Sequence, residues 1–452
     1  MATLLAPLFA ILPGTVIAPG VLPAQIPGDP LGPVVAEALD NNLGLAQLRA
    51  ASERADARTR EARSRFLPSL ALESRRSTST GTINLGDAVN PAYAALNELI
   101  GDPRFPTDLD VALPRQHETR LRLTQPLFDP TAVAAYALSR HARDGQEFQR
   151  RAAARQLAAG AQSAYLNVSA ARSARKTWEA TLALVVESER VAGRLVDAGR
   201  ATPDAVFRAR ADRSDVEQRL AEARETELAA ARAFNQLLRR PLDRPVDDLA
   251  DSLFRFEIAV TEEEAVAHAL VRREELAQAG ADIDAARANV RLATASFLPS
   301  VALALDYGFQ GRELRLSRDE DFTVASVVLS WDVFSGGRDI ARRQGAAADA
   351  ERLRLRRAEL EDVIRLDVRQ AHGAAVVARN AIATADARRA AARRTFDLVR
   401  RRYEEGLATQ LEFLDARTTL TDAELNQVIT TYRYALRYVE LERAAALREL
   451  AR

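Results

Sequence analysis

The chain contains two copies of one unit, and this internal repeat constrains its fold more than any other feature of the sequence. The tetrapeptide FLPS begins at Phe66 and again at Phe297, and Gly-x-Ala-Thr begins at Gly199 and again at Gly406. The two copies are further apart at the first match than at the second, so the first copy carries an insertion. It falls in residues 81–114, a stretch with Gly, Asn and Pro that we expect to be a surface loop.

Each copy predicts the same order of elements: a helix, two strands, and two long helices joined by a turn. We expect a first repeat over residues 25–240, a linker over 241–262 and a second repeat over 263–452. The expected helices before the strands cover residues 34–65 and 263–296. The expected strands cover residues 69–80, 118–127, 300–309 and 322–333.

The strands have one apolar and one polar face. Leu121 and Leu123 alternate with Arg120 and Arg122, which predicts a half-apolar strand. Strands of about ten residues are long enough to cross a bilayer at a tilt. Four such strands cannot close a barrel, and open edges are not tolerated in lipid. If these are membrane strands, several copies of the chain must share one barrel.

Residues 131–198 and 338–404 contain no proline, and each predicts a helix roughly 100 Å long at about 1.5 Å per residue. Helices of this length are typical of coiled coils. The returning helix of the second copy has apolar residues and Thr at heptad spacing. One row is Leu411, Thr418, Leu425 and Tyr432, and the other is Leu414, Thr421, Val428 and Ala435. A soluble structural coiled coil is the alternative, and the amphipathic strands argue against it.

The first residues are apolar but are interrupted by several Pro and Gly, which disfavours a membrane-spanning helix. We expect residues 1–24 to be a secretory signal peptide. A disordered N-terminal tail remains the alternative, because residues 1–10 contain no Lys or Arg. No later run of about 18 apolar residues predicts a transmembrane helix.

Composition excludes several classes of function. Lys+Arg and Asp+Glu number 63 each, so no overall charge attracts nucleic acid. The chain has no cysteine, and its four histidines are far apart, so we expect no disulfide and no metal site. We find no GxSxG, HExxH, phosphate-loop or dinucleotide motif, and we expect neither an enzyme nor a cofactor.

Seven short motifs, in order through both copies, resemble the outer-membrane efflux protein family of the TolC type. They are residues 66–69 (FLPS), 125–128 (QPLF), 164–168 (AYLNV), 235–238 (NQLL), 331–337 (WDVFSGG), 403–406 (YEEG) and 414–420 (LDARTTL). The resemblance covers residues 34–450.

The resemblance implies a mainly α chain with a small membrane β part, long antiparallel helical hairpins and four strands per chain. Three chains would form a homotrimer with one shared twelve-stranded β-barrel in the outer membrane of a Gram-negative bacterium. The helices would extend as an α-barrel into the periplasm. The implied partners are outer-membrane lipid, a periplasmic adaptor (membrane fusion) protein and an inner-membrane pump.

The resemblance also assigns roles to residues at the two helical turns. The constriction of the pore would involve Glu412, Asp415 and Tyr403. Glu412 and Asp415 are spaced i, i+3 and share a helix face, so a trimer would bring six carboxylates together and raise their pKa values. The alternative is that both acids favour the helix dipole and face solvent. The adaptor would dock at Gly199, Arg200, Ala201, Gly406, Leu407 and Ala408.

Two positions depart from the family pattern. Ala408 stands where the family has an arginine, and Ala205 stands where it has an acid, although Asp204 is adjacent. We therefore expect closure of the pore to use other contacts.

The function that the resemblance implies is export of small molecules as the outer-membrane channel of a tripartite efflux system. Type I protein secretion and heavy-metal efflux are alternatives within the same fold. A periplasmic coiled-coil scaffold without a pore is the alternative from another class.

Overall fold

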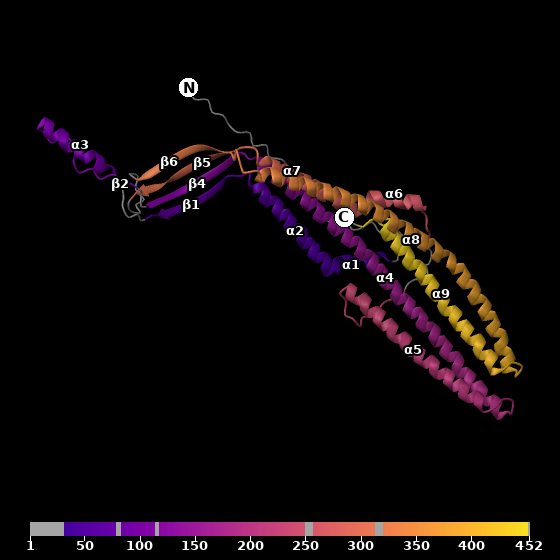
Figure 1. The fold of residues 1–452 in the computed structure, drawn as a ribbon. Coiled ribbons are helices and arrows are strands. Elements are labelled where there is room, and N and C mark those ends of the chain that lie inside the picture. Colours follow the sequence, from indigo (N-terminus) through magenta and orange to yellow (C-terminus); the bar gives the residue numbers. More distant parts are fainter. Residues whose placement is uncertain (1–30, 78–82, 114–116, 249–255, 312–319, 451–452) are drawn as a thin grey trace, which may run out of the picture. The chain divides into compact units, whose positions relative to one another are not determined.

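The computed structural model describes residues 31–77, 83–113, 117–248, 256–311 and 320–450 (Figure 1). The expected signal peptide, residues 1–24, lies outside these ranges. The elements in chain order are α1 (Gly32–Asn41), α2 (Leu43–Ser64), β1 (Ser69–Arg76), β2 (Ile83–Asn84), α3 (Leu85–Ile100), β3 (Ala112–Leu113), β4 (His117–Phe128), α4 (Pro130–Asp197), α5 (Asp204–Leu237), α6 (Glu262–Arg272), α7 (Glu274–Ala295), β5 (Ser300–Gly311), β6 (Asp321–Ser330), α8 (Arg338–Glu404) and α9 (Gln410–Ala444).

The predicted order of helix, two strands and long helical hairpin is present in both copies, and the fold class is confirmed as mainly α with a four-stranded antiparallel sheet. The helices α4 and α8, with 68 and 67 residues, match their predicted ranges closely. Each helix expected before the strands is in fact two helices. Asn42 and Arg273 are extended, with ψ of 125° and 122°, and an extended residue ends the helical path.

The chain forms two compact units, and each unit contains parts of both copies. The first unit comprises residues 1–42, 154–271 and 366–452, and the second comprises residues 43–153 and 272–365. The chain passes from one unit to the other next to both helix breaks and within the continuous helices α4 and α8.

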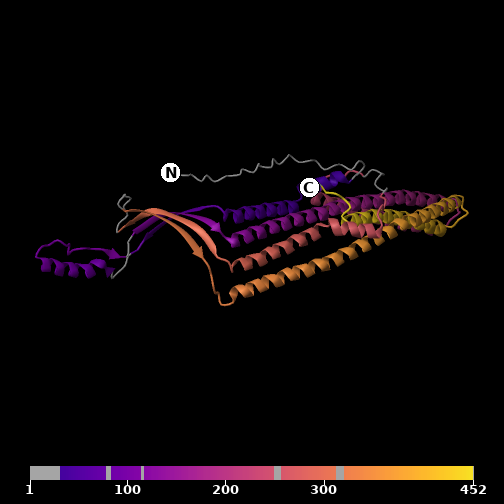
Figure 2. The same cartoon turned by 90° about the horizontal axis from the view of Figure 1, so that it is seen from above.

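The second unit is built on the sheet, whose strand order is β1-β4-β5-β6. The helices that adjoin these strands lie side by side in the same order, α2, α4, α7 and α8 (Figure 2). The Thr59 hydroxyl of α2 donates to the Ser139 carbonyl of α4 at 3.3 Å. On the other side of α4, Gly145 leaves room for the Asp282 carboxylate of α7. The helix order therefore follows from the strand order.

The register of the sheet confirms the alternation predicted from the sequence. Leu72 lies opposite Leu121, and Leu121 lies opposite Tyr307, so these side chains share one face. Leu305, two residues from Tyr307, and Ala325 of β6 extend the same face. Leu72 is 73 % exposed, and the apolar face of the sheet is exposed in the described part of the chain.

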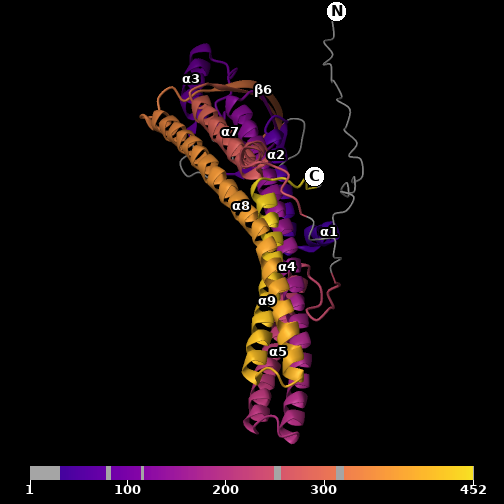
Figure 3. The same cartoon turned by 90° about the vertical axis from the view of Figure 1, so that its right-hand side faces the viewer.

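The first unit contains α5, α9 and the parts of α4 and α8 next to the turns, residues 154–197 and 366–404, and the two hairpins run together there in Figure 3. Leu166 of α4 packs with Tyr432 and Val439 of α9 in one buried cluster. The Thr181 and Thr421 hydroxyls join the same two helices at 3.2 Å. Among the described residues, no helix is both long and apolar enough to cross a membrane.

The insertion in the first copy is not the plain surface loop that we expected from residues 81–114. It contains helix α3, and asparagine side chains bind the returning segment to it. The Asn97 amide exchanges two hydrogen bonds with the backbone of Phe105, at 2.7 and 2.9 Å. The Asn90 amide does the same with Leu109, with both bonds at 2.9 Å. Gly86 is required here, because a Cβ atom would lie 1.6 Å from the Leu109 carbonyl oxygen.

Of the two heptad rows predicted on α9, the row that begins at Leu411 is wrong at the start of the helix, whereas the row that begins at Leu414 contains the buried Thr421. Leu411 is 69 % exposed, and Thr418 is also exposed. The buried residues near the turn are instead Phe413, Ala416 and Leu420. The rows become correct farther along, where Tyr432 and Ala435 are buried. Leucine and threonine at heptad spacing indicated a seam, but aromatic packing at the turn decides which face is buried.

Candidate functional site at the helical turns

Both hairpin turns have the same backbone geometry. Gly199 and Gly406 have φ of 68° and 77°, the left-handed conformation that glycine adopts without strain. After Gly199, the Arg200 N–H donates to the Leu195 carbonyl at 2.8 Å. After Gly406, the Leu407 N–H donates to the Arg402 carbonyl at 2.7 Å. The repeat thus places all six residues expected at the docking tips, including Ala201 and Ala408, in two equivalent turns.

Glu412 and Asp415 lie in the first turns of α9 and are both exposed, as their spacing predicts. The Glu412 carboxylate accepts from the Thr409 N–H at 2.7 Å and from the Thr409 hydroxyl at 2.9 Å, which forms a capping box. These hydrogen bonds hold the pKa of Glu412 below its ordinary value. Within one chain, the direction of this shift is opposite to the one expected from crowding in a trimer. The Asp415 carboxylate has no hydrogen bond or ion pair with any described residue.

Tyr403 does not lie on this exposed face. It is 4 % exposed, and its ring stacks on Phe413 with centroids 4.9 Å apart. Phe413 also contacts Phe396, with centroids 5.7 Å apart. Burial raises the pKa of the Tyr403 hydroxyl. In this chain Tyr403 is part of the aromatic core of the second turn, and a role in a constriction remains a prediction.

The two hairpins are connected near the turns by a hydrogen bond and an ion pair between α5 and α9. The Gln410 side-chain N–H donates to the Ala205 carbonyl at 2.7 Å. Two helical turns farther on, the Arg417 guanidinium pairs with the Asp212 carboxylate at 2.5 Å. Ala205 thus joins the two hairpins through its backbone carbonyl, although its methyl side chain cannot form a hydrogen bond. Ala408 contributes no side-chain hydrogen bond of its own.

The ion pair between Arg417 and Asp212 is buried, with side-chain exposures of 7 % and 15 %. We did not predict it from the sequence. The signal was the repeat, which aligns Arg417 with Arg210 of the first copy. Arg210, however, is exposed and pairs with Glu189 of its own hairpin. Only the register of α9 decides that Arg417 points inward, and that register was wrong at the start of the helix.

The sheet has a second charged site on the face opposite its apolar side. Arg122 forms two hydrogen bonds with Asp306 of the next strand, at 2.7 and 2.9 Å. Arg120 binds Glu73 at 2.6 Å and lies 3.4 Å from Glu118. Glu73, Arg120, Arg122 and Asp306 are therefore paired across strands β1, β4 and β5.

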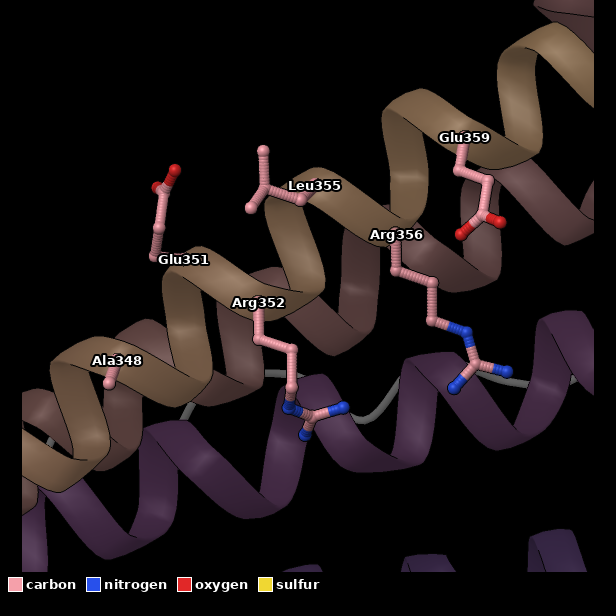
Figure 4. Close-up of a pocket in the computed structure, with 6 residues that line it drawn as sticks. All are labelled: Ala348, Glu351, Arg352, Leu355, Arg356 and Glu359. Carbon is pink, nitrogen blue, oxygen red and sulfur yellow. The ribbon is translucent and has the colours of Figure 1, made fainter.

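The groove on helix α8 in the second unit, with a volume of about 560 Å³, is a weak candidate for a site. Figure 4 shows that Arg352 and Arg356 extend to one side of the helix, whereas Glu351 and Leu355 extend to the other. Leu355 is 55 % exposed. Side chains that diverge from an open surface do not define a ligand. The described ranges also hold no group of three or more His, Asp or Glu arranged for a metal ion.

A family model described as "Outer membrane efflux protein" matches residues 34–238 and 265–447, which include both hairpins and all four strands of the sheet. The chain belongs to this family. The outer membrane efflux protein family is a family of transport proteins of the outer membrane, and its two matched segments correspond to the two sequence copies.

Two curated relatives of this efflux protein match over part of their length. Protein CyaE of Bordetella pertussis is 36 % identical over 166 residues, which are 36 % of this chain and 35 % of that protein. The pyoverdine export outer membrane protein OpmQ of Pseudomonas putida is 31 % identical over 165 residues, which are 35 % of this chain and 34 % of that protein. The matched segments thus span about a third of each relative.

Solved structures of outer-membrane channels have the same fold. CusC has a TM-score of 0.77 at 18 % identity, with 92 % of each chain covered. VceC of Vibrio cholerae has a TM-score of 0.74 at 18 % identity, with 92 % of this chain and 95 % of that chain covered. MtrE of Neisseria gonorrhoeae, solved in an open state, has a TM-score of 0.73 at 19 % identity, with 92 % and 88 % covered.

Proposed function

We propose that this efflux family member is one protomer of a homotrimeric outer-membrane channel that exports small molecules. Its partners would be a periplasmic adaptor protein and an inner-membrane pump, and the pump would supply the energy. The family match supports the channel, and the pyoverdine export protein among the relatives supports a small-molecule substrate.

The sheet is the observation that carries this proposal. Its apolar face is exposed, and its outer strands β1 and β6 each pair with one neighbour among the described residues. A sheet with two open edges and an apolar face is unstable alone in water or lipid. Because β1 and β6 run in opposite directions, β1 of one copy can pair antiparallel with β6 of the next. Three copies would then close one barrel.

The two turns would form the periplasmic mouth of the channel. Three-fold symmetry would turn the exposed Glu412 and Asp415 into two rings of carboxylates, and such rings favour cations. Crowding would raise the pKa of Glu412, against the effect of its capping box. The adaptor would dock at the two glycine turns, whose shared backbone geometry offers similar surfaces.

Single-channel conductance in a planar bilayer tests the proposal. We would compare the wild-type chain with Glu412→Gln/Asp415→Asn, because Gln can keep the capping box while the charge is lost. The matched control is Glu222→Gln/Glu225→Gln, which removes an exposed i, i+3 acid pair from α5. We expect wild type and control to conduct with cation selectivity, and the Glu412 variant to lose that selectivity.

Equal cation selectivity in all three proteins would support a channel but contradict the proposal that Glu412 and Asp415 line its mouth. A folded protein that needs no detergent and gives no conductance would reject the channel and favour a periplasmic scaffold. To separate small-molecule export from type I protein secretion, both activities would be measured in a bacterial strain that lacks this protein. Loss of protein secretion alone would overturn the assigned substrate class.

A further inference from the structure

A small cavity lies between the two hairpins of the first unit, next to the second turn. Helix α4 contributes Val191 on one side, and α8 and α9 contribute Phe396 and Phe413 on the other. Its volume is about 70 Å³. A single water needs about 10–15 Å³ on this measure, and a cavity of about 150 Å³ encloses benzene. The space therefore exceeds one water and admits part of one ring.

The wall of the cavity is aromatic. Phe396 and Phe413 are 1 % and 4 % exposed, and Tyr403 stacks on Phe413. Aromatic rings prefer edge-to-face or offset partners at centroid distances of about 4.5–7 Å. Part of a ring placed in this cavity would meet such partners from helices α8 and α9.

The Ser188 hydroxyl in the cavity has no partner among the described residues. Ser188 of α4 is 3 % exposed, and its hydroxyl forms no hydrogen bond with any described residue. Other hydroxyls on the same helix donate to the carbonyl four residues earlier: Ser169 to Tyr165 at 3.1 Å, and Thr181 to Thr177 at 3.0 Å. A buried hydroxyl without a partner costs free energy, so the Ser188 position favours a ligand that can hydrogen-bond.

The charges at the rim are already balanced. The Arg400 guanidinium lies 3.7 Å from Asp397 and 3.9 Å from Glu404. Glu187 is paired with Arg190 at 2.7 Å. The rim carboxylates are about half exposed, so the cavity opens to solvent on that side. A charged ligand would find no free counter-charge, whereas the Arg400 Nε–H has no acceptor and can donate to a ligand oxygen.

We propose that this cavity, the Ser188 cavity, binds a small uncharged aromatic molecule that carries a hydroxyl group, of the phenol class. The hydroxyl and one edge of the ring would enter against Phe396 and Phe413, with the hydroxyl bound to Ser188, and the rest of the ring would extend out of the open side. Since α4 belongs to the first hairpin and α8 and α9 to the second, an occupied cavity joins the two hairpins. This site does not depend on the channel function, because every contact that defines it lies within one chain.

Fluorine NMR of 4-fluorophenol with the purified full-length chain in detergent tests the site. We expect saturable broadening with a dissociation constant in the millimolar range, since so small a ligand has few atoms with which to bind. Val191→Phe fills the cavity and should abolish the broadening. Ser188→Ala should weaken binding about five-fold, the value of one modest hydrogen bond. Ser169→Ala, whose hydroxyl is bonded within its own helix, should leave binding unchanged.

Fluorobenzene, which lacks the hydroxyl, is the second probe. It should bind wild type more weakly than 4-fluorophenol does, and it should bind Ser188→Ala and wild type equally. Circular dichroism checks that each variant is folded, and Leu184→Phe replaces Val191→Phe if that variant is not. Equal broadening in wild type and a folded filled variant overturns the proposal, because the probe then binds elsewhere or in the detergent. No broadening of 4-fluorophenol by wild type overturns it as well.

Discussion

At the scale of residues, the buried pair of Arg417 and Asp212 is the contact that mutation can test most directly. The interaction of two charges out of water barely repays their desolvation, but removing one partner leaves the other charge buried alone. We expect Arg417→Leu to lower the free energy of local opening of α5 and α9 by about 3–5 kcal/mol. The double variant Asp212→Leu/Arg417→Leu should recover most of this loss. Hydrogen exchange of amides in the two helices measures both, and equal losses in the single and double variants would contradict the argument.

The same pair predicts a pH dependence. Burial raises the pKa of the Asp212 carboxyl above its ordinary value of 3.8, and the Arg417 charge offsets this only in part. An acid with a raised folded-state pKa contributes stability that is present below the unfolded pKa and is lost as pH rises through the folded pKa. Arg417→Leu removes the offsetting charge, so its destabilisation should be small near pH 4 and large at pH 7. The exchange measurement at both pH values checks the sign, and a larger loss at pH 4 would refute it.

The capping box at the start of α9 gives a third residue-scale prediction. The Thr409 hydroxyl accepts from the Glu412 N–H at 3.2 Å. We expect Thr409→Ala to cost about 1 kcal/mol in the stability of the first turn of α9, and Thr409→Ser to cost little. Amide exchange of residues 412–414 is the measurement. Equal exchange in the Ala and Ser variants would mean that the cap contributes nothing.

At the scale of elements, the sequence predicts the helices and strands that depend on a local pattern of residues. The four strands of the sheet and the helices α4 and α8 follow from alternation, repeat and the absence of proline. The breaks at Asn42 and Arg273 do not, because neither residue is a strong breaker and each break lies where the chain passes between units. The prediction of the buried face of α9 near the turn was also wrong for the row that begins at Leu411. The packing of Phe413 against Tyr403 decides which face is buried there, and heptad spacing alone does not show it.

Helix α3 is the element that the sequence did not predict, because its asparagines, Gly86 and Pro91 are typical of a loop. Here Asn90 and Asn97 each bind both backbone groups of a residue on the returning segment. We expect Asn97→Ala to speed amide exchange at Phe105 by a factor of about 10, which corresponds to a loss near 1.4 kcal/mol. Asn97→Asp, which keeps the acceptor but loses the donor, should have a smaller effect. Unchanged exchange in both variants would show that the segment is held by other contacts.

At the scale of the whole molecule, the two copies in sequence and the two compact units in space do not coincide. Each unit takes its helices from both copies, because α4 and α8 pass from one unit into the other. Repeated motifs in the sequence show that there are two copies, but they do not predict how the helices of one copy pack against those of the other. The boundaries of the repeats therefore stay a prediction, and the contacts between the hairpins had to come from the structure.

Pairing of one chain with the next can be tested directly at the two edges of the sheet. The chain contains no cysteine, so introduced pairs report only the contacts that they are designed for. Leu72 of β1 and Thr323, Ala325 and Val327 of β6 share the apolar face and lie at opposite edges. If β1 of one copy pairs with β6 of the next, residues directly opposed across that edge will lie about 4.5–5.5 Å apart, and the three β6 positions test three successive registers on this face.

We expect Leu72→Cys combined with Thr323→Cys, Ala325→Cys or Val327→Cys to give covalent trimers under oxidation for at least one pair, seen on a non-reducing gel. Three linked chains close a ring, so species larger than a trimer should not accumulate. The control is Leu121→Cys with the same β6 positions, because β4 is flanked by β1 and β5 and cannot reach another copy. Monomers from all three pairs, in protein whose mass in detergent is that of an oligomer, would contradict pairing of β1 with β6 in these three registers.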